Sequence, residues 1–504
     1  MASVVAFERK HVGRLVPKNP NLLYVVCVGI AVVNEATLGY DASMMNGLNI
    51  LPQYTDFFHL TTATIGLNNA GIFFGGTLGA FFIQPVADGL GRKAGILIGA
   101  SIALVGVILQ TAAQNIGMFI LGRIILGIGP AISTGAVPPL LSEVLPAKHR
   151  GKIMGFFFSC FYVGSLVSAG INYRAVNISG TWAWRLPSIF QAFWSIMALV
   201  TLPFIPESPR WLLEHGQRDA ARETLAVIYG HGDPNDEQTT AVLAEIENVL
   251  HKEHQLYPGN PWKEMFASKA NRHRMAIIVI FGVMIQMLGD FVISFYLGSM
   301  LTQAGITDPI TQLEINIILS CWSFVVAVSG SLLLDVFGRR RTLIVCLIGM
   351  IVTLYIFGGM AKLYGTGSTN KSGIYGTIAF IFLYQGFYAF SVSPMTSLYP
   401  PEVLNLKLRT AGNAVFRFLN YGFGLLAAFT MSYAMDDLGY KFYFINASWD
   451  ILFLVLVYLL FIETARVPLE EVALRFGDIH VEDLGDGVEV VESVSVEPDL
   501  KERA

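Results

Sequence analysis

Charged side chains are scarce in this chain of 504 residues. Only 14% of the residues are Asp, Glu, Lys or Arg and 54% are apolar, whereas a typical soluble chain is about 25% charged. A soluble protein of this length would need several domains with charged surfaces, and the sequence lacks the charges to build them. The composition therefore indicates a membrane protein whose main surroundings are the lipid bilayer. The net charge of −4 gives no sign of nucleic-acid binding, and no nucleic-acid partner is expected.

Cysteine and histidine are also sparse, and neither occurs in the pattern that a metal site or a proton relay would need. The four cysteines are far apart in apolar segments and lack metal-ligand spacing, so we interpret all of them as free core thiols: Cys27, Cys160, Cys321 and Cys346. All nine histidines fall outside the apolar segments, which argues against a histidine proton relay and a metal site. No GxxxxGK, HExxH or CxxC motif occurs, which argues against an ATP-driven pump. We expect no cofactor, no metal and no enzymatic activity.

Long apolar runs are what the chain has in abundance. A helix needs about 20 apolar residues to cross the hydrocarbon core. Twelve segments qualify: 21–47, 65–87, 94–113, 117–141, 152–172, 184–204, 274–302, 313–336, 342–361, 374–399, 410–434 and 443–462. The polar stretch 205–273 between the sixth and seventh is predicted to hold short amphipathic helices at 219–229 and 237–251. The tail from Gly477 onward is acidic, lacks periodicity and is predicted to be disordered.

Lysine and arginine concentrate in alternate loops, for example at 339–341. The positive-inside rule then predicts that both termini and the segment 205–273 are cytoplasmic. Asn177 and Asn370 each begin an N-x-S sequon in loops predicted to lie outside. Both asparagines are candidate glycosylation sites, since such sequons are acceptors on the outer side of a membrane.

Three polar motifs recur in the same order, one half-chain apart. They occur at 88–93 and 335–340 (DxxGR followed by a basic residue), at 142–151 and 401–410, and at 206–210 and 462–466. Duplicated halves are what secondary transporters use to build two bundles around a central site. The sequence therefore predicts an all-α membrane protein with twelve transmembrane helices in two pseudo-symmetric six-helix bundles. The bundles are expected at 21–204 and 274–462, with cytoplasmic segments at 1–20, 205–273 and 463–504.

The repeated motifs carry carboxylates and guanidinium groups, which can pair bidentately between neighbouring helix ends. We expect one cytoplasmic network from Asp88/Arg92, Glu143/Arg150 and Glu207/Arg210, and a second from Asp335/Arg339, Glu402/Arg409 and Glu463/Arg466. Such networks can hold the inner face closed and break when it opens, which biases a two-state equilibrium. The alternative is simple anchoring at the membrane interface by snorkelling side chains.

The motifs resemble the sugar porter family of the major facilitator superfamily, over about residues 25–475. The resemblance is carried by 39–41 (GYD), the paired DxxGR motifs, Gly122 and Arg123 followed by Gly127 and Gly129, 138–151, 206–210 and 401–409. The stretches 39–47, 162–165, 184–191 and 306–309 are similar to the fungal lactose-permease-like branch. The resemblance implies a plasma-membrane transporter, expected to be a monomer, that moves a sugar with or without protons by alternating access.

Two charged residues of the spans match the family's proton-coupling positions. Asp41 matches the carboxylate that family symporters use for protons, and Arg123 matches the arginine that is its natural partner. Apart from the resemblance, an ionisable group within a span is costly and usually functional. If a proton displaces the Asp41–Arg123 pairing, protonation and solute binding become linked. A static structural pair is the alternative.

The positions that match the family's sugar site are partly kept and partly changed. Gln286, Tyr296 and Asn420 keep polar or aromatic residues of the family, whereas Phe158, Ser323 and Ser397 replace two amides and an aromatic residue. These changes leave open a different polyol, cyclitol, glycoside or other metabolite as the solute, moved in either direction.

Asp290 is the most unusual of these positions, because the similar branch has asparagine there. It lies one helical turn after Gln286 on the same helix face. A buried unmatched charge is costly, so Asp290 is expected to be protonated, paired with an arginine, or met by a donor on the ligand.

A non-transporting nutrient sensor on the same fold is a second hypothesis. Family sensors tend to carry long cytoplasmic tails, whereas here the tail after Phe476 is short and both Asp41 and Arg123 are present. These features favour transport.

Overall fold

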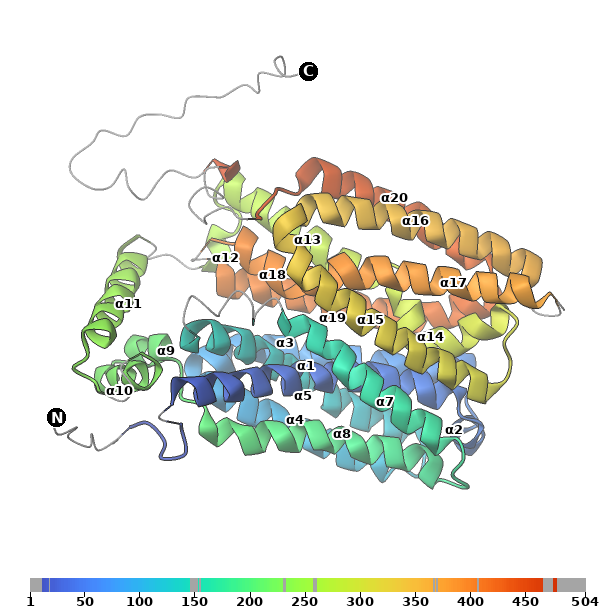
Figure 1. Ribbon diagram of the computed structural model, residues 1–504, viewed down its shortest axis with the longest axis horizontal. Coiled ribbons are helices and arrows are strands. Elements are labelled where there is room, and N and C mark those ends of the chain that lie inside the picture. Colours follow the sequence, from blue (N-terminus) through green and yellow to red (C-terminus); the bar gives the residue numbers. More distant parts are fainter. Residues whose placement is uncertain are drawn as a thin grey trace, which may run out of the picture.

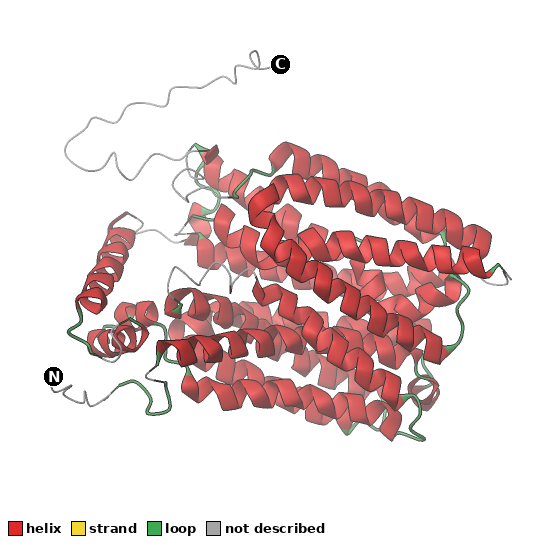
Figure 2. Cartoon of the chain, viewed as in Figure 1, coloured by secondary structure: helices red, strands yellow, loops and turns green. Residues whose placement is uncertain are grey.

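The described part of the chain is helical, without a strand (Figure 2). The computed structural model describes residues 11–17, 19–145, 153, 156–229, 233–256, 261–365, 368, 370–405, 408–465 and 475–477. Its helices are α1 (Pro20–Ile50), α2 (Pro52–Phe58), α3 (Thr62–Gly89), α4 (Arg92–Thr111), α5 (Ile116–Val144), η1 (Phe158–Cys160), α7 (Phe161–Ala175), α8 (Trp182–Thr201), η2 (Leu202–Phe204), α9 (Pro209–Glu214), α10 (Arg218–Ile228), α11 (Glu237–Leu256), α12 (Pro261–Glu264), α13 (Lys269–Met287), α14 (Asp290–Gln303), α15 (Pro309–Phe337), α16 (Arg339–Tyr364), α17 (Lys371–Phe387), η3 (Tyr388–Val392), α18 (Ser393–Val403), α19 (Arg409–Asp437) and α20 (Lys441–Leu460).

The long helices lie in two groups side by side (Figure 1). The blue to teal helices α1 to α8 form one group and the yellow to red helices α13 to α20 form the other, while α9, α10 and α11 project from one end. We call the two groups the N half and the C half. Eleven helical stretches within the described residues are long and apolar enough to cross a membrane. The remaining predicted span, 152–172, corresponds to η1 and α7, and part of its beginning lies outside the described residues.

Side-chain caps define several helix starts. Asn115, Ser268 and Asp308 each accept a main-chain N–H from three residues ahead, at the starts of α5, α13 and α15. Such caps satisfy amides that the first helical turn leaves unpaired. The helices predicted at 219–229 and 237–251 correspond to α10 and α11, whereas α2, α9 and α12 were not expected from the sequence.

Two spans are interrupted near the middle of the molecule. The stretch predicted as 274–302 breaks at Leu288 and Gly289, between α13 and α14. The stretch predicted as 374–399 contains a π-helical turn, η3, between α17 and α18. Breaks and π turns within membrane helices recur at functional sites, because they expose main-chain groups and redirect side chains.

Glycine allows α1 and α7 to pack closely. A Cβ atom on Gly39 would lie 1.7 Å from the main-chain oxygen of Phe161, and one on Gly164 would lie 1.9 Å from that of Ala36. Small residues at helix interfaces are the usual means of close packing within membranes. This contact holds the part of α1 that carries Asp41 firmly against α7.

Two sequence expectations are corrected by the fold. Cys27, Cys160 and Cys346 are buried, but Cys321 is exposed on the outer side of α15. The prediction of four core thiols was therefore wrong for Cys321, since an apolar segment facing lipid has an outer surface as apolar as its core. In addition, α13 begins at Lys269, earlier than predicted, so His273 lies within a candidate span.

Candidate functional site

A cluster of charges surrounds Arg92 at the start of α4. Its Nη1 donates a hydrogen bond of 2.9 Å to Asp88 Oδ1, and its Nε lies 3.6 Å from Glu143 Oε2. Glu207 accepts the main-chain N–H groups of Arg92 and Lys93, each at 3.1 Å. The ends of α3, α4, α5 and the segment before α9 are thereby joined.

The C half has an equivalent cluster around Arg339 at the start of α16. Arg339 Nη1 lies 2.6 Å from Asp335 Oδ1, and Arg339 donates to both oxygens of Glu402 at 2.9 and 3.1 Å. Glu463 accepts the main-chain N–H groups of Arg339 and Arg340 at 2.7 and 3.1 Å. The repeated motifs therefore build the same arrangement twice.

A glycine with positive φ precedes each of these helix starts. Gly91 has φ +107° and Gly338 has φ +92°, a conformation that side-chain-bearing residues rarely adopt. A Cβ atom would lie 2.7 Å from Glu207 Oε2 in the first case and 2.6 Å from Glu463 Oε2 in the second. The glycine of each DxxGR motif thus admits the carboxylate that caps the next helix, where the helix dipole favours negative charge.

Asp88 and Asp335 contact the arginine of their own motif, as expected from the sequence, but the glutamates differ. Glu143 and Glu402 approach Arg92 and Arg339, which belong to the other repeated motif of the same half. Arg210 Nε lies 3.7 Å from Glu214 Oε1. Arg409 is the first residue of α19. Arg150 and Arg466 lie outside the described residues.

Asp41 is buried on α1, and its carboxylate is only half satisfied. Oδ1 accepts a hydrogen bond of 2.6 Å from Gln191 Nε2 on α8, and Oδ2 has no hydrogen-bond partner. Gln191 Oε1 in turn accepts from Gln110 Nε2 of α4 at 3.0 Å. Asp41 therefore ends a chain of amides that crosses the N half.

Arg123 is buried on α5, and within the described part of the chain its hydrogen bond runs from Nε to the main-chain oxygen of Asn68, at 2.7 Å. Neither Nη atom has a partner. The two opposite charges attract each other, but the hydrogen-bonded Asp41–Arg123 pair expected from the sequence is not formed. The amide of Gln191 occupies the place next to the carboxylate instead.

A small cavity lies between the two halves. Hydroxyl and amide side chains dominate its lining, which consists of Ala42, Ser43, Asn46, Phe161, Tyr162, Ser165, Ile293, Ser294, Asn316, Leu319, Ser320, Ser323 and Gln385. Its free volume of about 30 Å³ is room for one or two water molecules. The cavity must expand before it can hold a hexose-sized solute.

Hydrogen bonds between the halves flank the cavity on both sides. Toward the end opposite α9 to α11, Asn46 Nδ2 donates to the main-chain oxygen of Ile293 at 3.4 Å, and Asn46 Oδ1 accepts from Leu297 N at 3.2 Å. On the other side, the hydroxyls of Tyr162 and Ser393 are 2.8 Å apart. Together with the small volume, these contacts define a conformation closed around the cavity.

Of the seven predicted solute-binding residues, Ser323 alone is among the residues that line this cavity. Asp290 lies beside it as the first residue of α14, and its Oδ2 accepts from the lining residue Ser294 at 3.4 Å. Gln286 Nε2 donates to Asn420 Oδ1 at 3.0 Å, so these two predicted residues contact each other.

The other three predicted residues are also absent from the lining. Tyr296 donates its hydroxyl to the main-chain oxygen of Ala428 at 2.6 Å. Phe158 stacks on Phe161 with ring centroids 5.9 Å apart. Ser397 is buried, and its Oγ has no hydrogen-bond partner.

Sequence reasoning did not single out several residues that the structure brings to this region. Asn46 and Gln191 lie within the stretches 39–47 and 184–191 that carry the branch resemblance, and a polar amide within a span is itself a signal. Asn316 and Gln385 carry the same signal on α15 and α17.

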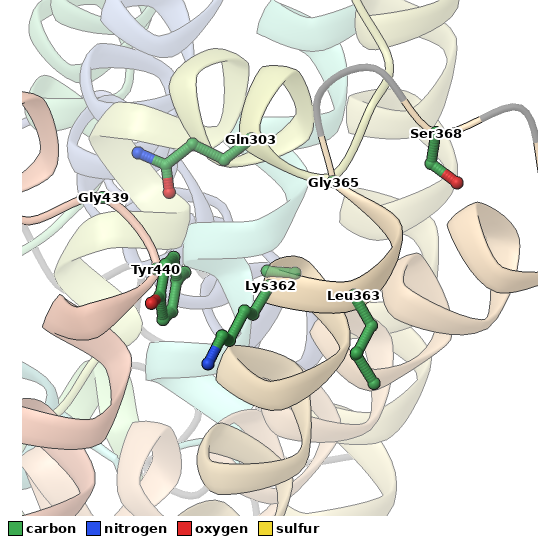
Figure 3. Close-up of a pocket in the computed structure, with 8 residues that line it drawn as sticks. Gln303, Lys362, Leu363, Gly365, Ser368, Gly439 and Tyr440 are labelled. Atoms are coloured by element: carbon green, nitrogen blue, oxygen red, sulfur yellow. The ribbon is translucent and has the colours of Figure 1, made fainter.

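A larger hollow of about 550 Å³ opens away from this site (Figure 3). It is lined by Gln303, Ala361, Lys362, Leu363, Gly365, Ser368, Gly439 and Tyr440, all in the C half. Lys362 Nζ lies 5.8 Å from the centroid of the Tyr440 ring. Because the N half does not contribute to it, this hollow does not lie on a path between the halves.

Both sequon asparagines are exposed. Asn177 lies in the turn after α7, and Asn370 caps α17 by accepting the N–H of Gly373 at 3.2 Å.

Comparison with known proteins gives a consistent result. A family model described as "Sugar (and other) transporter" matches residues 26–476. The chain is 28% identical to the MFS-type transporter oryC of Aspergillus oryzae, over 88% of this chain and 84% of the relative. It is 29% identical to a high-affinity glucose transporter of Kluyveromyces lactis, over 91% of this chain and 86% of the relative.

Solved structures resemble the fold. The proton:xylose symporter XylE of the major facilitator superfamily, bound to 6-bromo-6-deoxy-D-glucose, matches with a TM-score of 0.75 and 19% identity, over 91% of this chain and 100% of that chain. A partially occluded inward-open conformation of XylE from E. coli matches with a TM-score of 0.73, over 88% of this chain and 99% of that chain. The fold predicted from the sequence is confirmed.

Proposed function

Because the chain belongs to the Sugar (and other) transporter family, we propose that it carries a sugar or sugar-like solute across a membrane by alternating access, coupled to protons. The observation that supports this most is the cavity between the halves, with its hydroxyl and amide lining. A hydroxylated solute needs donors and acceptors in close alternation, which serine, asparagine and glutamine supply. The inter-half contacts on both sides of the cavity are the elements that would open in turn.

In this proposal the halves, 21–204 and 274–462, move as two bodies. The ion pairs around Arg92 and Arg339 tie the helix ends within each half, because each of these pairs joins residues of the same half. They would therefore keep each half rigid while the contacts of Asn46 and Tyr162 across the interface break and form. In this proposal the two clusters help to hold the inner face closed because they keep the helix ends of each half in place.

Asp41 is the proposed proton site. Its Oδ2 has no hydrogen-bond partner among the described residues, and the buried guanidinium of Arg123 attracts the ionised carboxylate. Asp41 directly precedes Ala42 and Ser43, which line the cavity on the same helix. A proton on Asp41 weakens its attraction to Arg123, so α1 and the α7 packed on it can shift together and reshape the cavity. Protonation and solute binding would thus be linked.

We further propose that the protein acts as a monomer in the plasma membrane, with both termini and the helices α9 to α11 on the cytoplasmic side. The helices α9 to α11 lie at the same end of the molecule as the start of α1 (Figure 1). Glycosylation at Asn177 and Asn370 would then occur on the outer side, where both are exposed.

Uptake into proteoliposomes tests the proposed function. Purified protein is reconstituted, and entry of a panel of labelled sugars and polyols is followed with and without an inward proton gradient. Transport that a proton gradient accelerates supports the proposal. Asp41→Asn should retain exchange of solute but lose the response to the gradient, while Asp437→Asn at the exposed end of α19 should behave as the wild type.

The second candidate function is import or export of a non-sugar metabolite. The carboxylate of Asp290 beside the cavity favours it, since neutral sugars do not require an acid there. Flux of such a compound in the same assay, without flux of sugars, would decide for it. Binding without flux of any compound would instead support a nutrient sensor.

A further inference from the structure

Asp290 is a carboxylate of the C half without a nearby cation. Its Oδ2 accepts from Ser294 at 3.4 Å, and its Oδ1 is shielded from solvent without a hydrogen-bond partner. No salt bridge of 4.0 Å or less involves it within the described residues. The sequence left three states for Asp290: protonated, paired with an arginine, or met by a donor on the ligand. The pairing with an arginine is therefore wrong.

The carboxylates on α1 are different in this respect. Asp41 is attracted by Arg123, and the buried Glu35 is attracted by Arg417 of α19. For Asp290 the stabilising neighbours are neutral, namely Gln385 and Ser294. Both neighbours line the cavity, so Asp290 lies directly behind its wall.

Asp290 has only neutral hydrogen-bonding neighbours among the described residues, so a charge on it requires a positive partner. The chain breaks at Gly289, and Asp290 is the first residue of α14. The dipole at a helix start is favourable for a negative charge there. A neutral asparagine would gain less from this position, so the location suits a carboxylate that meets a positive ligand group.

Three tyrosines surround the same carboxylate. Tyr162, Tyr384 and Tyr388 all interact electrostatically with Asp290. Of the three, Tyr162 also lines the cavity. Tyrosine side chains near a carboxylate can also contact an organic ammonium ion.

We propose that the solute carries a protonated amine next to its hydroxyl groups. The ammonium meets Asp290 among the tyrosines, while the hydroxyls meet the amides and hydroxyls of the cavity, including Asn46, Asn316 and Ser165. The inference rests on the proposed transport function and names its solute class: a hydroxylated amine, such as an amino sugar or amino polyol.

Ligand binding to the purified full-length protein tests this. Thermal unfolding is measured below pH 7 with two matched pairs that differ by an ammonium in place of a hydroxyl: D-glucosamine with D-glucose, and 1-amino-1-deoxy-D-glucitol with D-glucitol. The amine of at least one pair should bind about tenfold to a hundredfold more tightly, as a hydrogen bond to a charged group contributes. Asp290→Asn should bring that ratio close to one while it retains binding of the neutral partner.

Asp450→Asn is the matched control. Asp450 on α20 is another buried carboxylate of the C half, and it accepts from Asn446 Nδ2 at 3.0 Å, but it does not line the cavity. Its substitution should leave the amine preference unchanged. A preference for the neutral partners, or an amine preference that survives Asp290→Asn, would overturn the inference, and so would a lack of binding by all four compounds. Flux of a neutral solute in the proteoliposome assay would then leave the proposed function intact, whereas no flux would remove both.

Discussion

Gly91→Ala should destabilise the protein far more than the same change two residues earlier. At Gly91 the backbone has φ +107°, and an added Cβ would lie 2.7 Å from Glu207 Oε2. At Gly89, the last residue of α3, an added Cβ meets nothing within 4 Å. Comparison of the two alanine variants therefore separates the effect of the positive φ and the close carboxylate from the general effect of replacing glycine by alanine.

The expected cost at Gly91 combines two effects. A side chain in this glycine-favouring backbone region costs about 1–3 kcal/mol. Displacement of Glu207 weakens its bonds to the main-chain N–H groups of Arg92 and Lys93, each about 1.5–3 kcal/mol when one partner is charged. Because Glu207 is partly exposed, water replaces part of that loss. The net destabilisation is about 2–5 kcal/mol, whereas Gly89→Ala should change stability by about 1 kcal/mol or less and in the stabilising direction.

Thermal unfolding of both variants, followed by intrinsic fluorescence in the same detergent, measures the difference. Gly91→Ala should melt several degrees below the wild type. Equal melting temperatures for the two variants would refute the argument that this glycine is required to admit the capping carboxylate.

Three further predictions concern the contacts between helices. Arg339→Lys should lower the melting temperature, because lysine cannot form the bidentate contact with the α18 carboxylate. Arg341→Lys, at an exposed position of the same helix, should leave the melting temperature unchanged. Equal effects of the two substitutions would contradict this reasoning. Asn46→Ala should open the side of the cavity away from α9 to α11, seen as faster labelling of a cysteine introduced at Ser43, and unchanged labelling would argue against a closing role. The pKa of Glu247 is lowered by hydrogen bonds from its arginine partner on α10. This surface pair is therefore present above the usual glutamate range and is lost as pH falls through the lowered pKa, so Glu247→Gln should raise hydrogen exchange in α10 and α11 slightly at neutral pH and not at low pH.

Local sequence was informative wherever the signal lies within one helix or one motif. Apolar length predicted the spans, and the glycine and carboxylates of the DxxGR repeats predicted two equivalent charged helix ends. Local sequence was less informative about which side chains contact each other. The sequence suggested that Glu207 pairs with Arg210, whereas its carboxylate caps α4 from a distant part of the chain. Such contacts depend on how helix ends converge.

The candidate site shows the same limit. Asp41, Arg123 and Asp290 stand out in the sequence because ionisable groups in spans are costly. That Gln191 contacts Asp41, that Arg123 turns to the main chain of Asn68, and that Gln286 and Asn420 pair with each other could not be foreseen. Each of these contacts joins helices that are distant in sequence, and their spacing follows from packing across the whole bundle.

The sequence by itself determined that this is a membrane protein of two repeated halves, because hydropathy and repetition are properties of the linear chain. The tertiary structure alone decided which polar groups meet between those halves. It placed Asn46, Ser165, Asn316 and Gln385 around one cavity and left Asp290 beside it without a cation. The physical reason is that a helix restricts side chains only to a face, whereas the packing of several helices determines what each face meets.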